Sequence, residues 1–240
     1  MQEGQFAAAY HAVLAQTQVG PGTHHLDAGC GAGMATSLSA SLGAVVSGLD
    51  ASETLLEIAR ERTPGGDFRH GDLEAPPFDD DSFDLVTGFN SFQFAGDAAQ
   101  ALREAGRVTR PGGKIVVMTW GEPAGLEAAG HVAALKPLSP PPPPGAGGPF
   151  ALSEDASLRT FAEAGGLTPL EVVDVNTPRH YPDLATALRG MASSGVAVKA
   201  AEHSGEHILT SAMARFLTPF QKPGGSVTFG ASARYLIATV

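Results

Sequence analysis

Three glycines at alternate positions, Gly29, Gly31 and Gly33, follow a short apolar run that contains a carboxylate, Asp27, in the stretch HHLDAGCGAGMAT. A glycine-rich turn between a strand and a helix lets the backbone approach a ligand closely, and the N–H groups at the start of the helix accept anionic groups. The spacing therefore predicts a ligand-binding loop. The carboxylate beside it limits which ligand the loop can take.

Two phosphate-binding loops fit this stretch poorly. A dinucleotide fingerprint requires glycine or alanine where Met34 stands, and a Walker A loop requires a Gly-Lys-Ser/Thr run, whereas this loop contains no lysine. A carboxylate at Asp27 would repel a pyrophosphate but attract an ammonium. S-adenosylmethionine carries an ammonium, a sulfonium and a carboxylate, and the last can accept hydrogen bonds from a helix N-terminus. We therefore expect S-adenosylmethionine in the loop, with an NAD(P)-dependent oxidoreductase as a less favoured alternative.

Two further acidic residues follow the next two strands that the sequence predicts. Asp50 ends the run VVSGLD, where an acid can accept hydrogen bonds from ribose hydroxyls. Asp72 follows the next strand, where it could receive an adenine amino group while Leu73 packs on the ring. Each acid alone could instead cap a helix or a turn. Three acids at successive strand ends favour one binding site for an adenosine ligand.

The elements that must position these residues alternate along the chain. Strand-like runs (THHLDA, AVVSGLD, GDFRHGD, FDLVTGFN and KIVVMTW) are separated by helical patterns or loops, which predicts a parallel, doubly wound sheet. Ser52 is a predicted N-cap for the helix ETLLEIAR, and Pro111-Gly112-Gly113 predicts that the preceding helix ends near Thr109.

The second half of the chain is less regular. A run of five prolines from Pro140 to Pro144 predicts a stiff, extended surface connection. A helix capped at Ser153 and the strand LEVVDVNT follow it. We then expect a helical stretch from about residue 182 to residue 217, and SVTFGASARYLIATV as a closing strand.

At this point the sequence resembles a known family. The segments LDAGCGAG, GLDAS, GDLEAPPFDDDSFDLV and ALREAGRVTRPGGKIVV, in this order, are similar to the class I S-adenosylmethionine-dependent methyltransferases, within them to the branch that includes the ubiquinone/menaquinone-biosynthesis-type enzymes. The resemblance is strong over residues 26–120. It implies an α/β, Rossmann-like, doubly wound seven-stranded sheet, mostly parallel, whose antiparallel last strand ARYLIATV pairs with LEVVDVNT, together with a helical lid.

The resemblance also implies where the cofactor lies. It places the glycine loop and Asp27 near the methionine part, Asp50 at the ribose, and Asp72-Leu73 at the adenine. The expected cofactor-binding residues are Asp27, Gly29, Cys30, Gly31, Gly33, Asp50, Ala51, Ser52, Asp72, Leu73 and Asn90. Many relatives carry paired histidines where Asn90 to Gln93 stand in this chain, so no catalytic base can be transferred from them.

We expect one methyltransferase domain over residues 1–240. Within it, residues 1–18 would form an N-terminal lid helix, 19–177 the cofactor-binding core, 178–225 a helical lid insertion and 226–240 the final antiparallel strand. Apolar lid residues suit a small, largely apolar acceptor, although residues at helical spacing also simply form cores. These residues are Leu184, Leu188, Met191, Met213, Phe216 and Phe220.

Methyl transfer from a sulfonium is an in-line displacement with a neutral leaving group, so an enzyme must chiefly align the reactants and exclude water. A base is needed only when the acceptor is a hydroxyl, a protonated amine or a carbon acid. The catalytic residues therefore stay unknown from the sequence. Weak candidates are His180 and Tyr181, after the sixth strand, and Tyr10 on the N-terminal helix. A member of the fold that binds the cofactor without transferring methyl, such as a cyclase or a regulatory protein, is an open alternative.

Composition narrows the partners. The net charge of −10 and the pI near 5.2 disfavour a nucleic-acid partner, and no apolar run approaches the roughly 18 residues of a membrane span. The single cysteine, Cys30, and the absence of a signal-peptide pattern lead us to expect a cytoplasmic protein. The run HSGEH, His203 to His207, matches a zinc-protease pattern, but Gly205 weakens the helix this pattern needs, so we expect no metal. The acceptor and the oligomeric state stay open.

Overall fold

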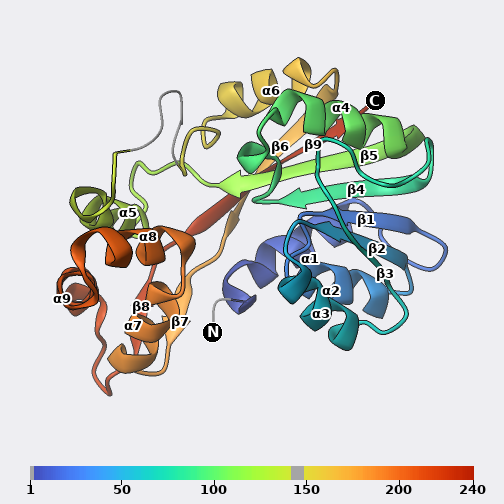
Figure 1. Cartoon of the computed structure of the whole chain (residues 1–240). Coiled ribbons are helices and arrows are strands. Elements are labelled where there is room, and N and C mark those ends of the chain that lie inside the picture. The colour runs from blue at the N-terminus through green and yellow to red at the C-terminus, as the bar shows by residue number, and fades with distance from the viewer. Residues whose placement is uncertain (1–2, 142–148) are drawn as a thin grey trace.

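The computed structural model describes residues 3–141 and 149–240, and Pro142 to Pro144 of the predicted proline connection lie outside the described residues. A twisted sheet with helices on both faces occupies one side of the molecule, and a separate group of helices lies beyond one end of the sheet (Figure 1). No helix of the described segments combines the length and the apolarity that a membrane span requires.

The main sheet has seven strands, in the order β3-β2-β1-β4-β5-β9-β6. Their bounds are β1 (His24–Ala28), β2 (Val45–Asp50), β3 (Asp67–His70), β4 (Phe83–Phe89), β5 (Thr109–Trp120), β6 (Thr168–Asn176) and β9 (Ser232–Thr239). The first five strands pair in parallel, and β9 pairs antiparallel with both β5 and β6. The predicted Rossmann-like sheet with an antiparallel last strand is thus confirmed.

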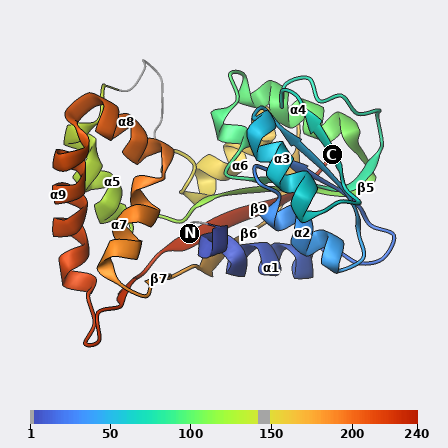
Figure 2. The same ribbon diagram turned by 60° about the horizontal axis from the view of Figure 1, so that its bottom comes forward.

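Helices cover the two faces of this sheet. One face carries α1, α2 and α3, and the other carries α4 and α6 (Figures 1 and 2). Their bounds are α1 (Ala7–Gln16), α2 (Met34–Ser41), α3 (Glu53–Arg62), α4 (Ala98–Val108) and α6 (Asp155–Ala164), with short 3-10 turns η1 (Glu3–Phe6) and η2 (Phe92–Phe94). Alternating strand residues face the two layers: Val116 and Met118 pack toward α1, whereas Ile115 and Val117 pack toward α4.

The remaining elements form the lid, a helical unit with its own apolar core (Figure 2). They are α5 (Ala129–Leu135), η3 (Lys136–Leu138), β7 (Arg179–Tyr181), α7 (Leu184–Ala192), α8 (Gly195–Ser204), α9 (Glu206–Leu217), η4 (Thr218–Phe220) and β8 (Val227–Phe229). The predicted helical stretch is therefore three helices. Helix α5 packs against α9 although it comes from the middle of the chain, between β5 and β6.

Three local expectations need correction. The closing segment is two strands, because Gly230 and Ala231 separate β8, which pairs with β7, from β9. Helix α6 has Glu154 and not Ser153 at its N-cap; the Ser153 hydroxyl donates instead to the Phe150 carbonyl at 2.7 Å. Strand β5 begins at Thr109 and not at Lys114, where the run KIVVMTW starts, and it runs through the Pro-Gly-Gly turn with an irregular register. The preceding helix α4 does end at Val108, next to the predicted Thr109. Ser52 does cap α3, as predicted.

Candidate functional site

The glycine loop lies between β1 and α2, and its three glycines have three different environments. All three have positive φ, at 81°, 53° and 73° for Gly29, Gly31 and Gly33. A Cβ at Gly29 would lie 2.3 Å from the Ser91 Cβ, and one at Gly33 would lie 2.9 Å from the Ala59 Cβ. At Gly31 nothing stands within 4 Å. Two glycines are therefore required by packing, and Gly31 borders the open space that a ligand would fill.

Asp27 is buried beneath this loop, whereas the sequence predicts its carboxylate beside the loop, exposed to an ammonium of the ligand. Its side chain is 1% exposed. The Thr36 hydroxyl donates to Oδ2 at 2.7 Å, and the Thr87 hydroxyl donates to Oδ1 at 3.2 Å. Burial raises the pKa of Asp27 to about 6, against the opposing effect of these two hydrogen bonds. The carboxylate therefore joins β1 to α2 and β4 through these two hydroxyls.

The buried network continues to His25 on the same strand. His25 Nε2 lies 2.8 Å from the Thr87 hydroxyl, and Nδ1 lies 2.8 Å from the Ser39 hydroxyl. Because the Thr87 proton points to Asp27, Nε2 is the donor of the ring and Nδ1 accepts from Ser39. Burial lowers the pKa of His25 to about 3, so the ring is neutral. This histidine packs within the sheet and joins β1 to α2 and β4.

Asp50 ends β2 beside the loop. Its Oδ2 accepts from the Gly31 N–H at 2.8 Å, and its Oδ1 accepts from the Ser52 N–H at 2.9 Å. An ionised carboxylate has about four acceptor positions, and the side chain is half-buried, so Asp50 retains capacity for ribose hydroxyls. Ala51, which separates Asp50 from the N-cap Ser52, accepts from the His70 ring at 3.0 Å through its carbonyl.

The other expected residues follow the next strands. Asp72 is exposed and accepts from the Glu74 N–H at 3.0 Å, while Leu73 packs against the sheet core. Asn90, after β4, has a φ of 56°, and its amide oxygen accepts from Gln93 Nε2 at 3.3 Å. A non-glycine residue in this region of φ is uncommon and often marks a ligand site. Cys30 is buried, and burial raises the pKa of its thiol, so it serves packing.

These residues fit S-adenosylmethionine. The carboxyl ends of parallel strands meet at one edge of a sheet, so the loop after β1, Asp50, Asp72 and Asn90 share that edge. An open space at Gly31 leaves room for the methionine part, and Asp50 beside it offers acceptors to a sugar.

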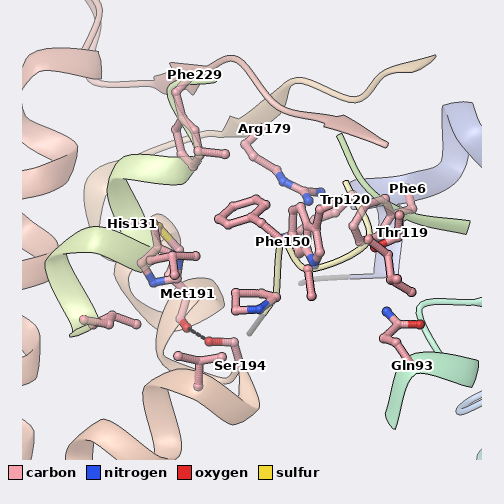
Figure 3. Close-up of a pocket in the computed structure, with 18 of the residues that line it drawn as sticks. Phe6, Gln93, Thr119, Trp120, His131, Phe150, Arg179, Met191, Ser194 and Phe229 are labelled. Carbon is pink, nitrogen blue, oxygen red and sulfur yellow. Dashed lines mark hydrogen bonds between the residues drawn. The ribbon is translucent and has the colours of Figure 1, made fainter. Parts of the chain in front are cut away.

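A cavity of about 440 Å³ opens between the sheet and the lid (Figure 3). Its walls are mainly apolar and aromatic, from Phe6, Phe94, Trp120, Leu135, Phe150, Met191 and Phe229. Of the six apolar lid residues expected to face an acceptor, Met191 alone lines this cavity; Leu184, Leu188, Met213, Phe216 and Phe220 pack within the lid core. For those five, core packing is the correct interpretation.

Of the three weak catalytic candidates, Tyr181 lines the cavity, and His180 and Tyr10 do not. The Tyr181 hydroxyl accepts from Gln5 Nε2 at 2.8 Å. His180 is exposed, and its Nδ1 lies 3.0 Å from the Thr228 hydroxyl. Because alternate residues of a strand face opposite sides, His180 points away from the cavity that Tyr181 lines, unlike what a catalytic candidate requires. Tyr10 packs edge-on against Phe89, with ring centroids 4.7 Å apart, and does not line the cavity.

Polar residues that were not singled out as candidates also line the cavity. Gln93, Thr119, His131 and Arg179 each have a buried side-chain atom with no hydrogen-bond partner among the described residues. For Arg179 a signal existed, because a strand that turns Tyr181 inward also turns the residue two positions earlier inward. His131 comes from α5, whose place in the lid nothing in the sequence indicated.

The HSGEH run does not form a continuous helix. Gly205, with a φ of 93°, separates α8 from α9. Within the ranges 3–141 and 149–240, no three His, Cys, Asp or Glu side chains gather in a way that could hold a metal ion.

Comparisons with known proteins identify the family of this chain. Residues 26–117 match the methyltransferase domain family. The malonyl-[acyl-carrier protein] O-methyltransferase of Erwinia billingiae is 34% identical over 182 residues, which cover 76% of this chain and 67% of that protein. The demethylmenaquinone methyltransferase of Renibacterium salmoninarum is 40% identical over 103 residues, 43% of this chain and 44% of that protein. The aligned part thus spans about two thirds of the former relative and less than half of the latter.

Solved structures show the same fold. The YcgJ protein from Bacillus subtilis superimposes with a TM-score of 0.63 and 20% identity, covering 96% of this chain and 97% of the other. The matched family, the related enzymes and the sheet order agree with one another. The chain belongs to the class I S-adenosylmethionine-dependent methyltransferases.

Proposed function

We propose that this methyltransferase transfers the methyl group of S-adenosylmethionine to a small, largely apolar acceptor bound in the cavity beneath the lid. The observation that carries the proposal is the position of Gln93, which lines the cavity and donates to the Asn90 side chain at 3.3 Å. Asn90 is an expected cofactor contact. One short segment after β4 therefore links the cofactor edge of the sheet to the acceptor cavity.

S-adenosylmethionine supplies an electrophilic methyl on a sulfonium, and methyl transfer to the acceptor's lone pair leaves a neutral thioether. The chain's own residues do the positioning. Asp50 and the loop beside Gly31 hold the cofactor, and the aromatic walls of the cavity exclude water and align the acceptor. His131 borders the cavity as a neutral ring, because burial lowers its pKa to about 4, and it is available to orient an acceptor.

The acceptor class rests on the cavity and not on the relatives. Those relatives are named for a malonyl group on acyl-carrier protein and for demethylmenaquinone, which are chemically different acceptors. A volume of about 440 Å³ lies within the range of about 300–1,000 Å³ that small-molecule sites occupy.

We further propose a cytoplasmic enzyme without a nucleic-acid partner, from its net charge of −10 and its buried free thiol; cell fractionation tests the location.

The experiment is incubation with methyl-labelled S-adenosylmethionine and a small-molecule extract, followed by separation of the labelled products. We expect label in a low-molecular-weight, apolar fraction. The Asp50→Asn variant, with one acceptor oxygen fewer beside the loop, should transfer less label at limiting cofactor. Binding of S-adenosylmethionine in calorimetry without a labelled product from any extract would contradict methyl transfer and favour the non-methylating alternative.

A further inference from the structure

The cavity contains a buried cation without an anion. Arg179, at the start of β7, is 4% exposed, and both its Nη1 and Nη2 atoms are buried with no hydrogen-bond partner in the described parts of the chain. A buried charge without a partner costs several kcal/mol, so proteins rarely leave one unless it binds something. The lining of the cavity includes no acidic side chain among the described residues.

Aromatic rings hold this cation in place. The guanidinium carbon lies 4.6 Å from the centre of the Phe6 ring and 5.3 Å from that of Trp120. Burial lowers the pKa of Arg179 to about 10, against the favourable effects of Tyr181 and Tyr10, so the group stays charged at neutral pH. Cation–π contacts offset part of the desolvation cost but leave the N–H donors at the edge of the guanidinium unsatisfied.

Other polar atoms without partners surround the same space. Gln93 Oε1, Thr119 Oγ1 and His131 Nε2 are buried in its walls and have no partner within the described residues. Figure 3 shows the Arg179 side chain reaching toward Trp120, with His131 and Gln93 on opposite sides of the view. The Arg179 charge also contributes to the lowered pKa of His131, which keeps that ring neutral. The described walls of the cavity thus carry one fixed positive charge, on Arg179, and are otherwise neutral.

The chemistry of this arrangement selects among anions. A guanidinium binds a planar carboxylate through two parallel hydrogen bonds. A phosphate monoester carries up to two negative charges at neutral pH, and no second cationic side chain lines the described cavity walls to balance it. Aromatic and aliphatic walls favour an apolar body on the ligand.

We propose that the methyl acceptor is an apolar carboxylic acid and that Arg179 binds its carboxylate. This inference rests on the proposed function, because it assigns the acceptor class of the same cavity. It makes Arg179 a specificity-determining residue that touches the acceptor, without a role in holding the cofactor.

Trp120 is the single tryptophan of the chain and lines the cavity, so its fluorescence reports binding there directly. We would titrate the protein, saturated with S-adenosylhomocysteine, with octanoate, octanamide and octyl phosphate. Octanoate should change the Trp120 emission saturably and bind at least tenfold more tightly than either of the others. Equal affinity for octanoate and octanamide, or preference for octyl phosphate, would overturn the proposal.

The Arg179→Met variant should lose this tenfold preference while its affinity for S-adenosylhomocysteine in calorimetry is unchanged. Arg189→Met removes an exposed arginine of the lid and is the matched control, which should keep the preference. Arg179→Lys, which keeps the charge but not the paired donors, should retain part of it. Circular dichroism of each variant confirms folding, and a folded Arg179→Met protein that still prefers octanoate overturns the assignment.

The failure of this proposal and the failure of the proposed function are distinguishable. Failure of methyl transfer would appear in the labelling experiment, whereas failure of the carboxylate assignment would leave both the labelling and the cofactor binding intact.

Discussion

At the scale of single residues, the glycines of the loop differ in what they do. Gly29 and Gly33 allow close packing against Ser91 and Ala59, so a side chain at either position meets neighbouring atoms. A Cβ at Gly31 would have no atom within 4 Å, and the backbone N–H of Gly31 donates to Asp50. The same residue type in one motif is therefore structural at two positions and exposed to ligand at one.

Gly31→Ala should weaken S-adenosylmethionine binding at least tenfold, because the new methyl group enters the open space beside the loop. Gly22→Ala is the matched control, since Gly22 also has a positive φ, 85°, and nothing within 4 Å. Both variants should lose about 1–2 kcal/mol of stability from backbone strain. Calorimetry measures the affinity, and equal affinity in the two variants would remove Gly31 from the site.

The pH dependence of stability should report the neutral state of His131. Its pKa is about 4 in the folded protein, below the ordinary value of 6.5. Between pH 4 and 6.5 the unfolded state binds more protons than the folded state. The contribution of the neutral His131 to the free energy of unfolding is therefore complete above pH 6.5 and is lost as pH falls toward 4. The maximum slope is about 1.4 kcal/mol per pH unit.

Urea unfolding from pH 4.5 to 7.5 tests this effect. His131→Gln should lose stability less steeply with acid than the wild type. Asp27 acts in the opposite direction, because its pKa is raised to about 6, but it is present in both proteins and cancels in the comparison. His203→Gln, at an exposed position of α8, should keep the wild-type slope. The same slope in all three proteins would show that His131 is not buried as described.

At the scale of elements, Arg234 of β9 joins segments that are distant in sequence. It donates to both carboxylate oxygens of Asp174 on β6, at 2.7 and 2.6 Å, to Glu122 at 2.6 Å and to the Ser153 carbonyl at 2.6 Å. These hydrogen bonds raise the pKa of Arg234. At the antiparallel end of the sheet, where β9 returns from the lid, the Arg234 side chain thus joins β9 to β6 and to the segments that contain Glu122 and Ser153.

Arg234→Met should lower the free energy of unfolding by about 1–3 kcal/mol, because several charge-assisted hydrogen bonds are lost from a nearly buried side chain. Arg159→Met removes an exposed ion pair to Asp155 within α6 and should cost about 0.5 kcal/mol or less. Chemical unfolding measures both. Comparable losses in the two variants would mean that the Arg234 network does not bear on stability.

Among the elements, the strands and helices of the first half follow closely from local patterns. Asp50 at the end of VVSGLD and Ser52 at the cap of α3 lie where the sequence predicts them. The lid was less predictable, because helix α5 joins α9 through contacts between residues far apart in the chain. Ser153 illustrates the same limit: it has the residue type of a cap, but its hydroxyl bonds to Phe150.

At the scale of the whole molecule, the sheet edge and the lid enclose one reaction space from opposite sides. Helix α1 docks on the sheet, where Tyr235 donates to the Gln16 side chain, while Gln5 before it reaches Tyr181 of the lid. The N-terminal segment therefore connects sheet and lid. This arrangement differs from a lid helix over residues 1–18, because the residues of the described N-terminal segment that line the cavity, Gln5 and Phe6, lie in the turn before α1.

Cofactor binding should stabilise the whole fold. A ligand at one hundred times its dissociation constant adds about 2.7 kcal/mol, which for a chain of this size raises the melting temperature by about 5–10 °C. We expect this shift with S-adenosylhomocysteine and none with NAD or NADP at equal concentration. Thermal unfolding followed by circular dichroism measures it, and stabilisation by the dinucleotides alone would contradict the cofactor assignment.

The sequence by itself determined the sheet, the glycine loop and the acidic strand ends, because these depend on contacts between near neighbours and on backbone conformations that few residues allow. Tertiary structure decided that Asp27 lies beneath the loop, which face of β7 meets the cavity, so that Arg179 and not His180 enters it, and that His131 joins them there. Burial and the pairing of β7 with β8 set these positions. They arise from segments separated by many residues, and local patterns carry no information about which segments meet.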